Sequence, residues 1–476
     1  MTPGPSPRRV SAVTDDALGR LDTVGLVEAI QSRQVGVREV VDAAIARVRA
    51  VDGDLGAMAF TAYDRGRSEA SDPRGGWFAG VPTVVKDNCD VAGMPTREGT
   101  DAWVGRPARA DGDFARMYLA TGLIPLGKSQ LSEFGFSAAA EHPRLGVVRS
   151  PWSLDHVAGA SSAGSAALVA SGALTLAHAN DGGGSIRIPA AVNGLVGLKP
   201  TRGRLAQDKA LREMPVRIVS DGVVTRSVRD TAAFYREAEH VYRSLSLPPV
   251  GDVTRPGHKR LRVAVNTTGA GVGASPEVAD LTMATAALLE ELGHSVTEVE
   301  APVPTGFRDD FLLYWATLAM VLVRTGRRRH GRSWDPTRLD NLTLGLAREA
   351  SRNLHRLPGA VRRLKRSTAL SAAFHASYDV VLTPTLGAVT PRVGHLDPTQ
   401  PYEVVIERLM EWVSFTPLQN ATGDPAISLP LATSSEGLPV GMMFSAGAGH
   451  EALLLGLGLE LEEARPFAVL GADPAV

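Results

Sequence analysis

Residues 157–203 read VAGASSAGSAALVASGALTLAHANDGGGSIRIPAAVNGLVGLKPTRG, and this stretch carries the strongest signal for fold and chemistry. It holds two loops of small residues, GASSAGS at 159–165 and DGGGS at 181–185. The glycines before Ser185 leave the backbone bare, so successive N–H groups can converge on a carbonyl oxygen. An oxyanion hole requires that arrangement. The second loop therefore predicts a site where a serine attacks a carbonyl group.

A serine hydroxyl needs a nearby base to become a good nucleophile. None of the 11 histidines lies in an obvious catalytic motif near these loops, and the nearest, His178, has the apolar flanks of a structural histidine. A lysine can replace histidine if burial lowers its pKa from about 10.4 towards 7 or 8. Lys86 ends the apolar run 81–85 and is expected at a buried strand terminus. The alternative is a surface ion pair with Asp87 or Asp90.

Strands and helices alternate along the chain on both sides of this stretch. The apolar spacing over 37–48 predicts an amphipathic helix. Residues 261–299 predict a strand, a helix that starts at Pro276 and ends before Gly293, and a second strand. Further elements are expected as strands at 379–382, 426–431 and 440–444 and as a closing helix at 451–462. The pattern favours an α/β fold with one mixed, mostly parallel central β-sheet covered by helices on both faces.

Two other segments have helical or basic character. Residues 166–176 can continue as a helix after the first loop, and the apolar run 311–323 is too short to span a bilayer, so it predicts a buried or pocket-lining helix. The arginines at 324–332 could bind phosphate, but a solvated loop after that helix is the preferred interpretation.

Composition limits the class of partner. Of 476 residues, 44% are hydrophobic and 21% charged, and the net charge of -1 gives no overall attraction to nucleic acid or to an anionic membrane. A small-molecule substrate is therefore expected. Cys89 is the only cysteine, so neither an internal disulfide nor a cysteine metal cluster can form. We expect a cytoplasmic location. We expect neither a metal nor a cofactor.

The two loops, together with GVPTVVKDN at 80–88, resemble the amidase signature family. GLKPTRGRL after the loops, LGKSQLSEFG before them and QNATGDPAISLP near the C-terminus extend the resemblance over residues 23–466. It implies a single amidase-signature domain, expected over 21–470, and we expect residues 1–20 to form a flexible arm.

The resemblance also implies a lysine, a serine in cis peptide geometry and a nucleophilic serine. Matched by motif, these are Lys86, Ser161 and Ser185, and the two serines lie 24 residues apart, as in the family. The oxyanion hole is then the backbone of Gly182, Gly183, Gly184 and Ser185. Three neighbouring polar residues are expected to support the loops: Ser162, Asp181 and Arg187.

The chain departs from the family pattern in both loops. Alanine stands at 160 and 163, where the family has glycine, and Gly182 stands where threonine is common. If Ala163 needed a positive φ, the loop would be destabilised by about 1 kcal/mol or more. Ala163 could therefore alter the geometry around Ser161.

The resemblance predicts an amidase that hydrolyses a small aliphatic, aryl or oligoamide substrate to an acid and an amine or ammonia through an acyl-Ser185 intermediate. Candidate pocket residues, each of which could also be ordinary core, are Phe134, Phe136, Tyr314, Trp315, Phe415 and Asn420. Two alternatives remain: a glutamine-hydrolysing subunit of a tRNA-dependent amidotransferase, and an inactive binding protein of the same fold. A homodimer is expected from the family.

Overall fold

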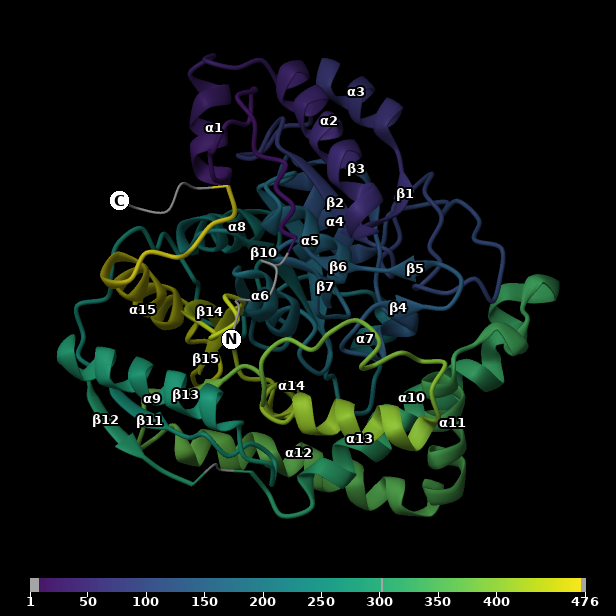
Figure 1. Ribbon diagram of the computed structural model, residues 1–476, viewed down its shortest axis with the longest axis vertical. Coiled ribbons are helices and arrows are strands. Elements are labelled where there is room, and N and C mark those ends of the chain that lie inside the picture. Colours follow the sequence, from purple (N-terminus) through teal and green to yellow (C-terminus); the bar gives the residue numbers. More distant parts are fainter. Residues whose placement is uncertain (1–7, 301–302, 472–476) are drawn as a thin grey trace, which may run out of the picture.

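The computed structural model describes residues 8–300 and 303–471. An eight-stranded sheet runs through the molecule in the order β12-β11-β13-β15-β14-β9-β10-β8 (Figure 1). Its strands are β8 (Leu176–Asp181), β9 (Val196–Lys199), β10 (Ser220–Thr225), β11 (Arg262–Val265), β12 (Ser295–Glu298), β13 (Val380–Pro384), β14 (Ala426–Thr433) and β15 (Pro439–Ser445).

The sheet is mixed, as expected, but the expectation that it is mostly parallel is wrong. Strand β11 pairs in parallel with β12 and β13, as the strand-helix-strand pattern of 261–299 predicts. All other neighbours in this sheet pair antiparallel. A buried apolar run does not reveal the direction of its partner, and the short turn between β14 and β15 makes a hairpin rather than a crossover.

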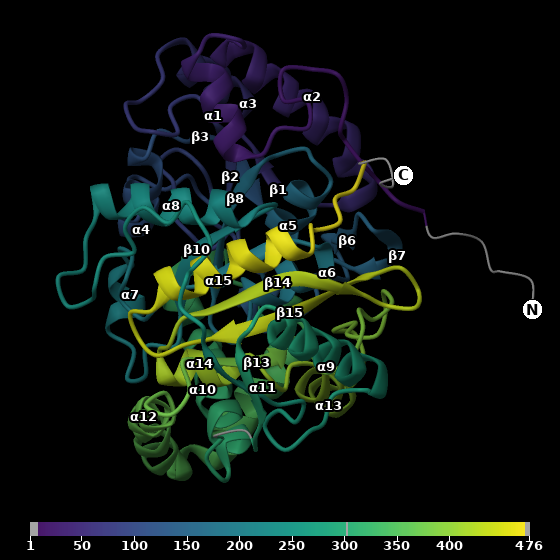
Figure 2. The same ribbon diagram turned by 90° about the vertical axis from the view of Figure 1, so that its left-hand side faces the viewer.

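Helices cover both faces of this sheet. Strand β14 turns Leu429 towards Gly458 of α15 (Glu451–Ala464), while Ser428 and Gly441 of β15 face Ala191 of α6 (Arg187–Asn193). Because successive residues of a strand point to opposite faces, α15 and α6 lie on opposite sides. Figure 2 shows α15 along the two long strands β14 and β15. The expected two-sided α/β architecture is confirmed.

A smaller sheet in the order β1-β3-β2 adjoins the main one. It consists of β1 (Met58–Thr61), β2 (Pro82–Lys86) and β3 (Ile124–Ser129), with α2 (Val37–Leu55) and α3 (Tyr63–Ser71) packed beside it. Strand β2 meets β8 of the main sheet through side chains: the hydroxyl of Thr83 donates to the carbonyl of Leu176 at 3.1 Å. This junction brings the end of β2 to the two small-residue loops.

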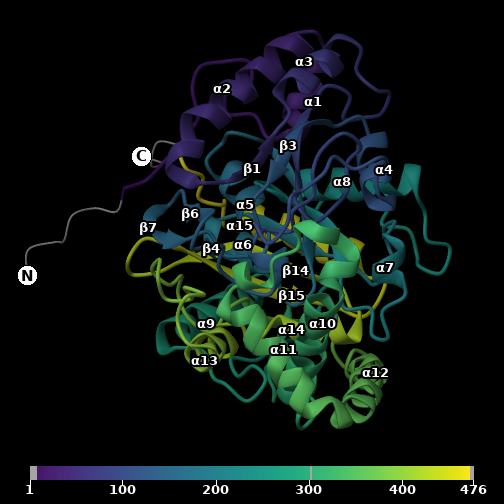
Figure 3. The same ribbon diagram turned by 90° about the vertical axis from the view of Figure 1, so that its right-hand side faces the viewer.

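The remaining helices gather at the two ends of the molecule and around the sheets. In all three views α1 to α3 lie at one end and α10 to α13 at the other (Figures 1, 2 and 3). The helices not yet bounded are α1 (Thr23–Gln31), α4 (Asp113–Ala120), α5 (Ala163–Ala170), α7 (Lys209–Arg212), α8 (Val228–Val241), α9 (Pro276–Glu291), α10 (Phe307–His330), α11 (Asn341–Asn353), α12 (Leu357–Phe374), α13 (Tyr402–Trp412) and α14 (Pro417–Thr422). Short 3-10 turns are η1 (Glu133–Gly135), η2 (Gly331–Ser333), η3 (Pro336–Arg338) and η4 (Leu354–Arg356), and short strands are β4 (Glu141–His142), β5 (Gly146–Val147), β6 (Arg149–Ser150) and β7 (Ser153–Val157).

Two expected element boundaries are wrong. The helix after the first loop stops at Ala170, because Gly172 turns the chain with φ +79° before β8 starts at Leu176. The arginines at 324–332 lie not in a loop but in the last turns of α10 and in η2. Arginine is a good helix former, and the helix ends only where Gly331 adopts φ +68°.

The expected arm over residues 1–20 lies partly outside the described residues. From residue 8 onward this segment packs on the domain: Ala12 donates its N–H to Ser171 and is 4% exposed, and Leu18 is 1% exposed. Residues 8–20 therefore differ from the flexible arm that we expect from the sequence. In the described parts of the chain, no helix combines the length and apolar character needed to cross a membrane.

Candidate active site

Lys86 ends strand β2 with its side chain fully buried. Its Nζ lies 2.7 Å from Ser161 Oγ and 2.7 Å from Asn180 Oδ1. Burial lowers the pKa of Lys86 from 10.5 to about 7, although the carboxylates of Asp221 and Asp181 act in the opposite direction. A neutral amine can donate one N–H to the Asn180 oxygen and turn its lone pair towards the Ser161 hydroxyl.

Ser161 lies in the first loop, between β7 and α5, and follows a cis peptide bond from Ala160. A Cβ atom added to Gly135 would stand 3.1 Å from Ser161 Oγ, so a glycine there leaves room around this hydroxyl. Ala163 is the first residue of α5, and it is absent from the described non-glycine residues that have positive φ. The loop therefore does not impose the strain that a positive φ at Ala163 would bring.

Asn180 joins the lysine to the first loop. It projects from β8, and its backbone N–H donates to Ser162 Oγ at 3.3 Å while Ser162 Oγ donates to the Asn180 carbonyl at 3.3 Å. Its amide nitrogen donates to Asn88 Oδ1 at 3.0 Å, which fixes the amide with its oxygen towards Lys86. Asn180 thus gives the amine of Lys86 a second fixed partner besides Ser161.

The glycine loop connects β8 to α6 and ends at Ser185. Thr416 donates its hydroxyl to the carbonyl of Gly183 at 2.5 Å. Because C=O and N–H point in opposite directions across a trans peptide, this bond turns the N–H of Gly184 away from Thr416. Gly184 has φ +143°, and a Cβ atom there would lie 2.4 Å from Thr416 Oγ1, so only glycine fits. A loop fixed in this way is suited to hold N–H groups for an oxyanion.

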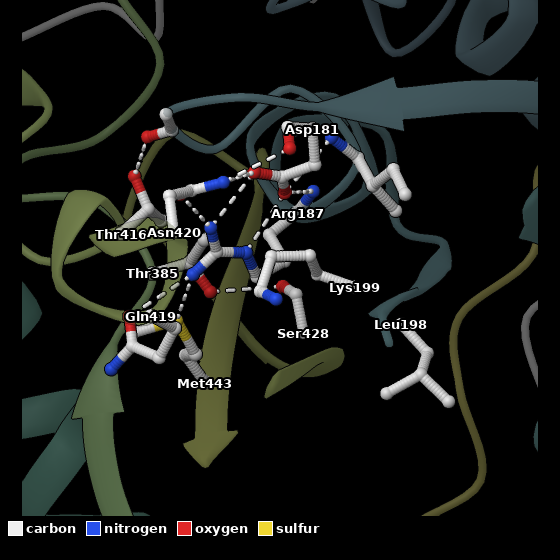
Figure 4. A network of polar contacts seen from close by, with 12 residues as sticks. Asp181, Arg187, Leu198, Lys199, Thr385, Thr416, Gln419, Asn420, Ser428 and Met443 are labelled. Carbon is white, nitrogen blue, oxygen red and sulfur yellow. Dashed lines mark hydrogen bonds and ion pairs between the residues drawn. The ribbon is translucent and has the colours of Figure 1, made fainter. Parts of the chain in front are cut away.

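A buried ion pair anchors both ends of the same loop (Figure 4). Arg187 Nε and Nη2 each donate to the carboxylate of Asp181 at 2.9 Å. Asn420 donates its amide to the backbone oxygen of Asp181 at 2.9 Å and accepts from Arg187 at 2.7 Å. Burial alone would raise the pKa of Asp181, but Arg187 and Asn420 bring it down to about 2. Asp181 and Arg187 therefore brace Ser185 without contacting its hydroxyl.

A narrow apolar cavity of about 60 Å³ opens beside Ser185. Helices α10 and α13 form much of its wall. Its lining residues are Gly135, Phe136, Ser137, Ala138, Ala160, Gly183, Ser185, Ile188, Phe311, Leu312, Trp315, Ile406, Leu409, Met410, Val413 and Pro417. The polar side-chain groups in this lining are the hydroxyls of Ser137 and Ser185 and the indole N–H of Trp315, and no charged side chain belongs to it.

The structure brings two of the six candidate pocket residues, Phe136 and Trp315, to this cavity. The other four lie elsewhere. Phe134 stacks on Trp103, with ring centroids 5.8 Å apart, and Tyr314 donates its hydroxyl to the carbonyl of Val216 at 2.8 Å. Phe415 lines a separate cavity, and Asn420 belongs to the Asp181 network.

Sequence reasoning missed Asn180 and Thr416. Asn180 could have been found, because the alternation of β8 places His178 and Asn180 on one face and Asp181 on the other. Thr416 gave no signal, since nothing local connects it to a loop 233 residues earlier. In residues 8–300 and 303–471, no group of three or more His, Cys, Asp or Glu side chains is arranged to hold a metal ion.

Comparison with known proteins gives consistent matches. The Amidase family model matches residues 39–455. A protein named "Putative amidase AmiC" from Mycobacterium leprae is 61% identical over 462 residues, which cover 97% of this chain and 98% of that protein. The 6-aminohexanoate-cyclic-dimer hydrolase of Paenarthrobacter ureafaciens is 31% identical over 480 residues, covering 94% and 95%. A solved structure of 6-aminohexanoate cyclic dimer hydrolase with substrate superposes with a TM-score of 0.85 at 28% identity, covering 95% of this chain and 98% of that one.

Proposed function

This chain belongs to the amidase family, and on that premise we propose that Ser185 is its nucleophile, with Ser161 and Lys86 as its proton relay. The protein is a hydrolase that acts on the C–N bonds of carboxylic amides. The observation that carries the residue assignment is the 2.7 Å contact between Lys86 Nζ and Ser161 Oγ, with both side chains buried. Ser185 and Ala160, the neighbour of Ser161, line the same cavity, which supports placing the relay at one site.

The reaction starts with neutral Lys86. It accepts the proton of Ser161 while Ser161 accepts the proton of Ser185, and Ser185 Oγ adds to the amide carbonyl carbon. The negative oxygen formed is stabilised by backbone N–H groups of Gly182, Gly183, Gly184 and Ser185. A loop already fixed by other contacts needs little rearrangement to do this.

The tetrahedral intermediate then breaks down. Ser161 gives a proton to the leaving nitrogen, the C–N bond breaks, and the acyl group stays on Ser185. Water loses a proton to the same relay, adds to the acyl carbon and displaces Ser185. The carboxylic acid leaves, and the serines recover their protons. In this scheme Asp181, Arg187 and Ser162 orient the loops and take no part in proton transfer.

The cavity beside Ser185 supports a neutral, apolar acyl group, of aryl or medium-length aliphatic type. Apart from the hydroxyls of Ser137 and Ser185 and the indole N–H of Trp315 its lining has no polar side-chain group, and none is charged, so a charged group placed there would lose its hydration without gaining an opposite charge. The relative named 6-aminohexanoate-cyclic-dimer hydrolase is named for a cyclic oligoamide with aliphatic segments, which agrees with such a pocket. An oligoamide substrate is therefore included in the proposal.

The same observation argues against glutamine as substrate. Glutamine carries an ammonium and a carboxylate group, and this lining provides no opposite charge for either. Neither the amidotransferase subunit nor the inactive binding protein is favoured, since the chain aligns with amidases over nearly its whole length. We also propose that it acts as a homodimer in the cytoplasm, without nucleic acid. Family resemblance supports the dimer, and the single cysteine supports the cytoplasmic location. The net charge of -1 supports the absence of nucleic acid.

The test is release of amine or ammonia from hexanamide, hexanoyl anilide, a 6-aminohexanoate oligoamide and glutamine. The wild type should hydrolyse one or more apolar amides and leave glutamine intact. Ser185→Ala should lower kcat/KM by about a thousandfold or more, and Lys86→Ala by about 10²–10⁴-fold, the usual contribution of a general base. Ser137→Ala is the matched control, a serine of the same cavity outside the relay, and should stay within a few-fold of wild type. Full turnover by Ser185→Ala or Lys86→Ala would refute the assignment.

A further inference from the structure

The proposed reaction does not use two buried side chains near Lys86, those of His178 and Asp221. His178 and Asn180 project from the same face of β8, since they are two residues apart. Strand β10 pairs antiparallel with β8 and sets Asp221 opposite Asn180, so Asp221 shares this face with His178. His178 is fully buried and Asp221 is 4% exposed. The sheet register therefore groups His178, Asn180 and Asp221 around the lysine.

His178 holds the backbone of the lysine. The N–H of Lys86 donates to His178 Nδ1 at 3.2 Å. A backbone N–H can only donate, so Nδ1 carries no proton and the ring proton is on Nε2. Burial lowers the pKa of His178, which agrees with a neutral ring. The imidazole is thus a fixed acceptor at the point where β2 ends.

Asp221 is a carboxylate without a close cation. His178 Nε2 donates to Asp221 Oδ1 over a long 3.4 Å, and Oδ2 accepts no hydrogen bond. Within the described residues, no lysine or arginine forms an ion pair with Asp221. A buried negative charge stabilises a positive charge that forms nearby more strongly than an exposed one would. The positive charge that forms here during turnover is the ammonium of Lys86.

We propose that His178 and Asp221 are positioning residues for the lysine base. His178 fixes the main chain at Lys86, and the Asp221 carboxylate stabilises the Lys86 ammonium formed when Ser161 loses its proton. The inference rests on the proposed function, because both residues are assigned to support Lys86 as the base of the relay. It also accounts for a buried histidine that accepts from the Lys86 N–H and for a buried carboxylate whose Oδ2 accepts no hydrogen bond.

Other titratable groups packed around this cluster define the controls. Asp181 acts on Lys86 as Asp221 does, but it also braces the nucleophile loop. Burial, and the Asp221 carboxylate with it, raises the pKa of Asp208, whereas the carboxylates that act on the pKa of Lys86 are those of Asp221 and Asp181. Other titratable groups of the described residues near Lys86, His178 or Asp221 are Asp87, Cys89, Tyr118, Lys128 and Tyr235. Asp208→Asn is therefore the matched control, since it removes one carboxylate from the same region.

The expected change has a definite sign. The relay needs neutral Lys86, so activity rises with pH through the pKa of Lys86, about 7 in the wild type. Asp221→Asn removes a charge that favours the ammonium, so the acid limb of the profile should move to lower pH by about one unit. The rate on the plateau should fall up to about tenfold, because the ammonium formed in the reaction is less stable. Asp208→Asn should leave the limb in place.

The experiment measures the rate at which a fluorophosphonate labels Ser185 between pH 5 and 9, in the full-length wild type and in each variant. This readout reports the state of the relay without knowledge of the natural amide. A limb that moves only in Asp221→Asn supports the inference. An unmoved limb, or an equal shift in Asp208→Asn, overturns it. If the wild type is not labelled, or if Ser185→Ala is labelled equally, the nucleophile assignment fails and the inference fails with it.

A second pair of variants tests His178 even if Asp221→Asn does not fold. His178→Asn can keep an oxygen acceptor near the position of Nδ1, whereas His178→Leu leaves the Lys86 N–H unpaired. The plateau rate should stay within about threefold of wild type in His178→Asn and fall about tenfold or more in His178→Leu, with the limb retained in both. Equal plateau rates in the two variants would contradict the positioning role.

Discussion

Thr416 is a single residue on which the shape of the glycine loop depends. Its hydroxyl donates to the carbonyl of Gly183, and its Oγ1 also occupies the space that a side chain at Gly184 would need. The first contact sets the direction of the peptide that precedes Gly184, and the second limits residue 184 to glycine. A hydroxyl outside the cavity lining therefore sets the direction of an N–H group that is expected to contact the substrate.

Thr416→Val should lower kcat by about tenfold to a hundredfold with a smaller change in KM, because the isosteric side chain keeps the packing but releases the Gly183 carbonyl. Steady-state kinetics with an apolar amide measure this. Thr368→Val is the matched control, since Thr368 donates to the carbonyl of Thr422 in α14, away from the loop. Equal losses in both variants would point to the stability of α14 rather than to the loop.

What the sequence reveals at this scale depends on locality. Lys86, Ser161 and Ser185 stand out because their neighbours are unusual: three glycines, two small-residue loops and an apolar run before a lysine. Asn180 follows from the alternation of one strand. Thr416 does not, because its role depends on where α14 settles in three dimensions. A residue that acts only through tertiary contact leaves no local pattern to read.

At the scale of elements, α10 and α13 form much of the apolar wall of the substrate cavity. Helix α10 contributes Phe311, Leu312 and Trp315, and α13 contributes Ile406, Leu409 and Met410. These two helices are far apart in sequence and lie at the same end of the molecule (Figure 3). Their side chains therefore set the space available for the acyl group.

Met410→Trp should shift the preference towards small acyl groups, because an indole fills space that a longer chain would occupy. We expect kcat/KM for hexanoyl anilide to fall about tenfold or more relative to that for acetyl anilide. Paired kinetics with the two anilides measure the ratio. Glu407→Trp adds the same bulk to the exposed side of α13 and should leave the ratio unchanged. An unchanged ratio in Met410→Trp would exclude α13 as the wall of the acyl site.

Whether a segment is a helix or a strand was predictable from its periodicity. The direction of strand pairing and the ends of the helices were less predictable. The strand-helix-strand unit of 261–299 appears where expected, with Pro276 opening α9 and Gly293 following it. Antiparallel pairing of β14 with β9 was not predictable, because a fully buried strand reads the same in either direction. The extension of α10 through its arginines does not follow from their charge, because a solvated helix and a solvated loop both carry arginines.

At the scale of the whole molecule, Arg204 ties the segment after β9 to the C-terminal helix. Its Nε and Nη2 donate to the carboxylate of Glu451 at 2.6 and 2.7 Å, and Nη1 donates to Glu239 at 2.7 Å. All of these groups are at most 9% exposed. Breaking such a buried pair leaves an uncompensated charge, which is far more costly than losing an exposed pair.

Arg204→Met should lower the free energy of unfolding by about 3–5 kcal/mol, since both carboxylates would stay buried without their partner. Urea unfolding followed by circular dichroism measures it. Arg67→Met removes an exposed pair with Asp42 and should change the free energy by less than about 1 kcal/mol. Similar values for the two variants would show that the Arg204 pair adds nothing beyond a surface contact.

The contacts of α14 with the glycine loop also have a consequence for synthesis. All three residues of the proposed relay have been synthesised once the ribosome passes Ser185. Thr416 and Asn420, which hold the glycine loop, are synthesised much later. A nascent chain halted before codon 416 would carry every reacting group but would lack Thr416, Asn420 and the central strands β14 and β15. We expect such a fragment to hydrolyse no amide. Activity would then begin only after the chain has been translated beyond these residues.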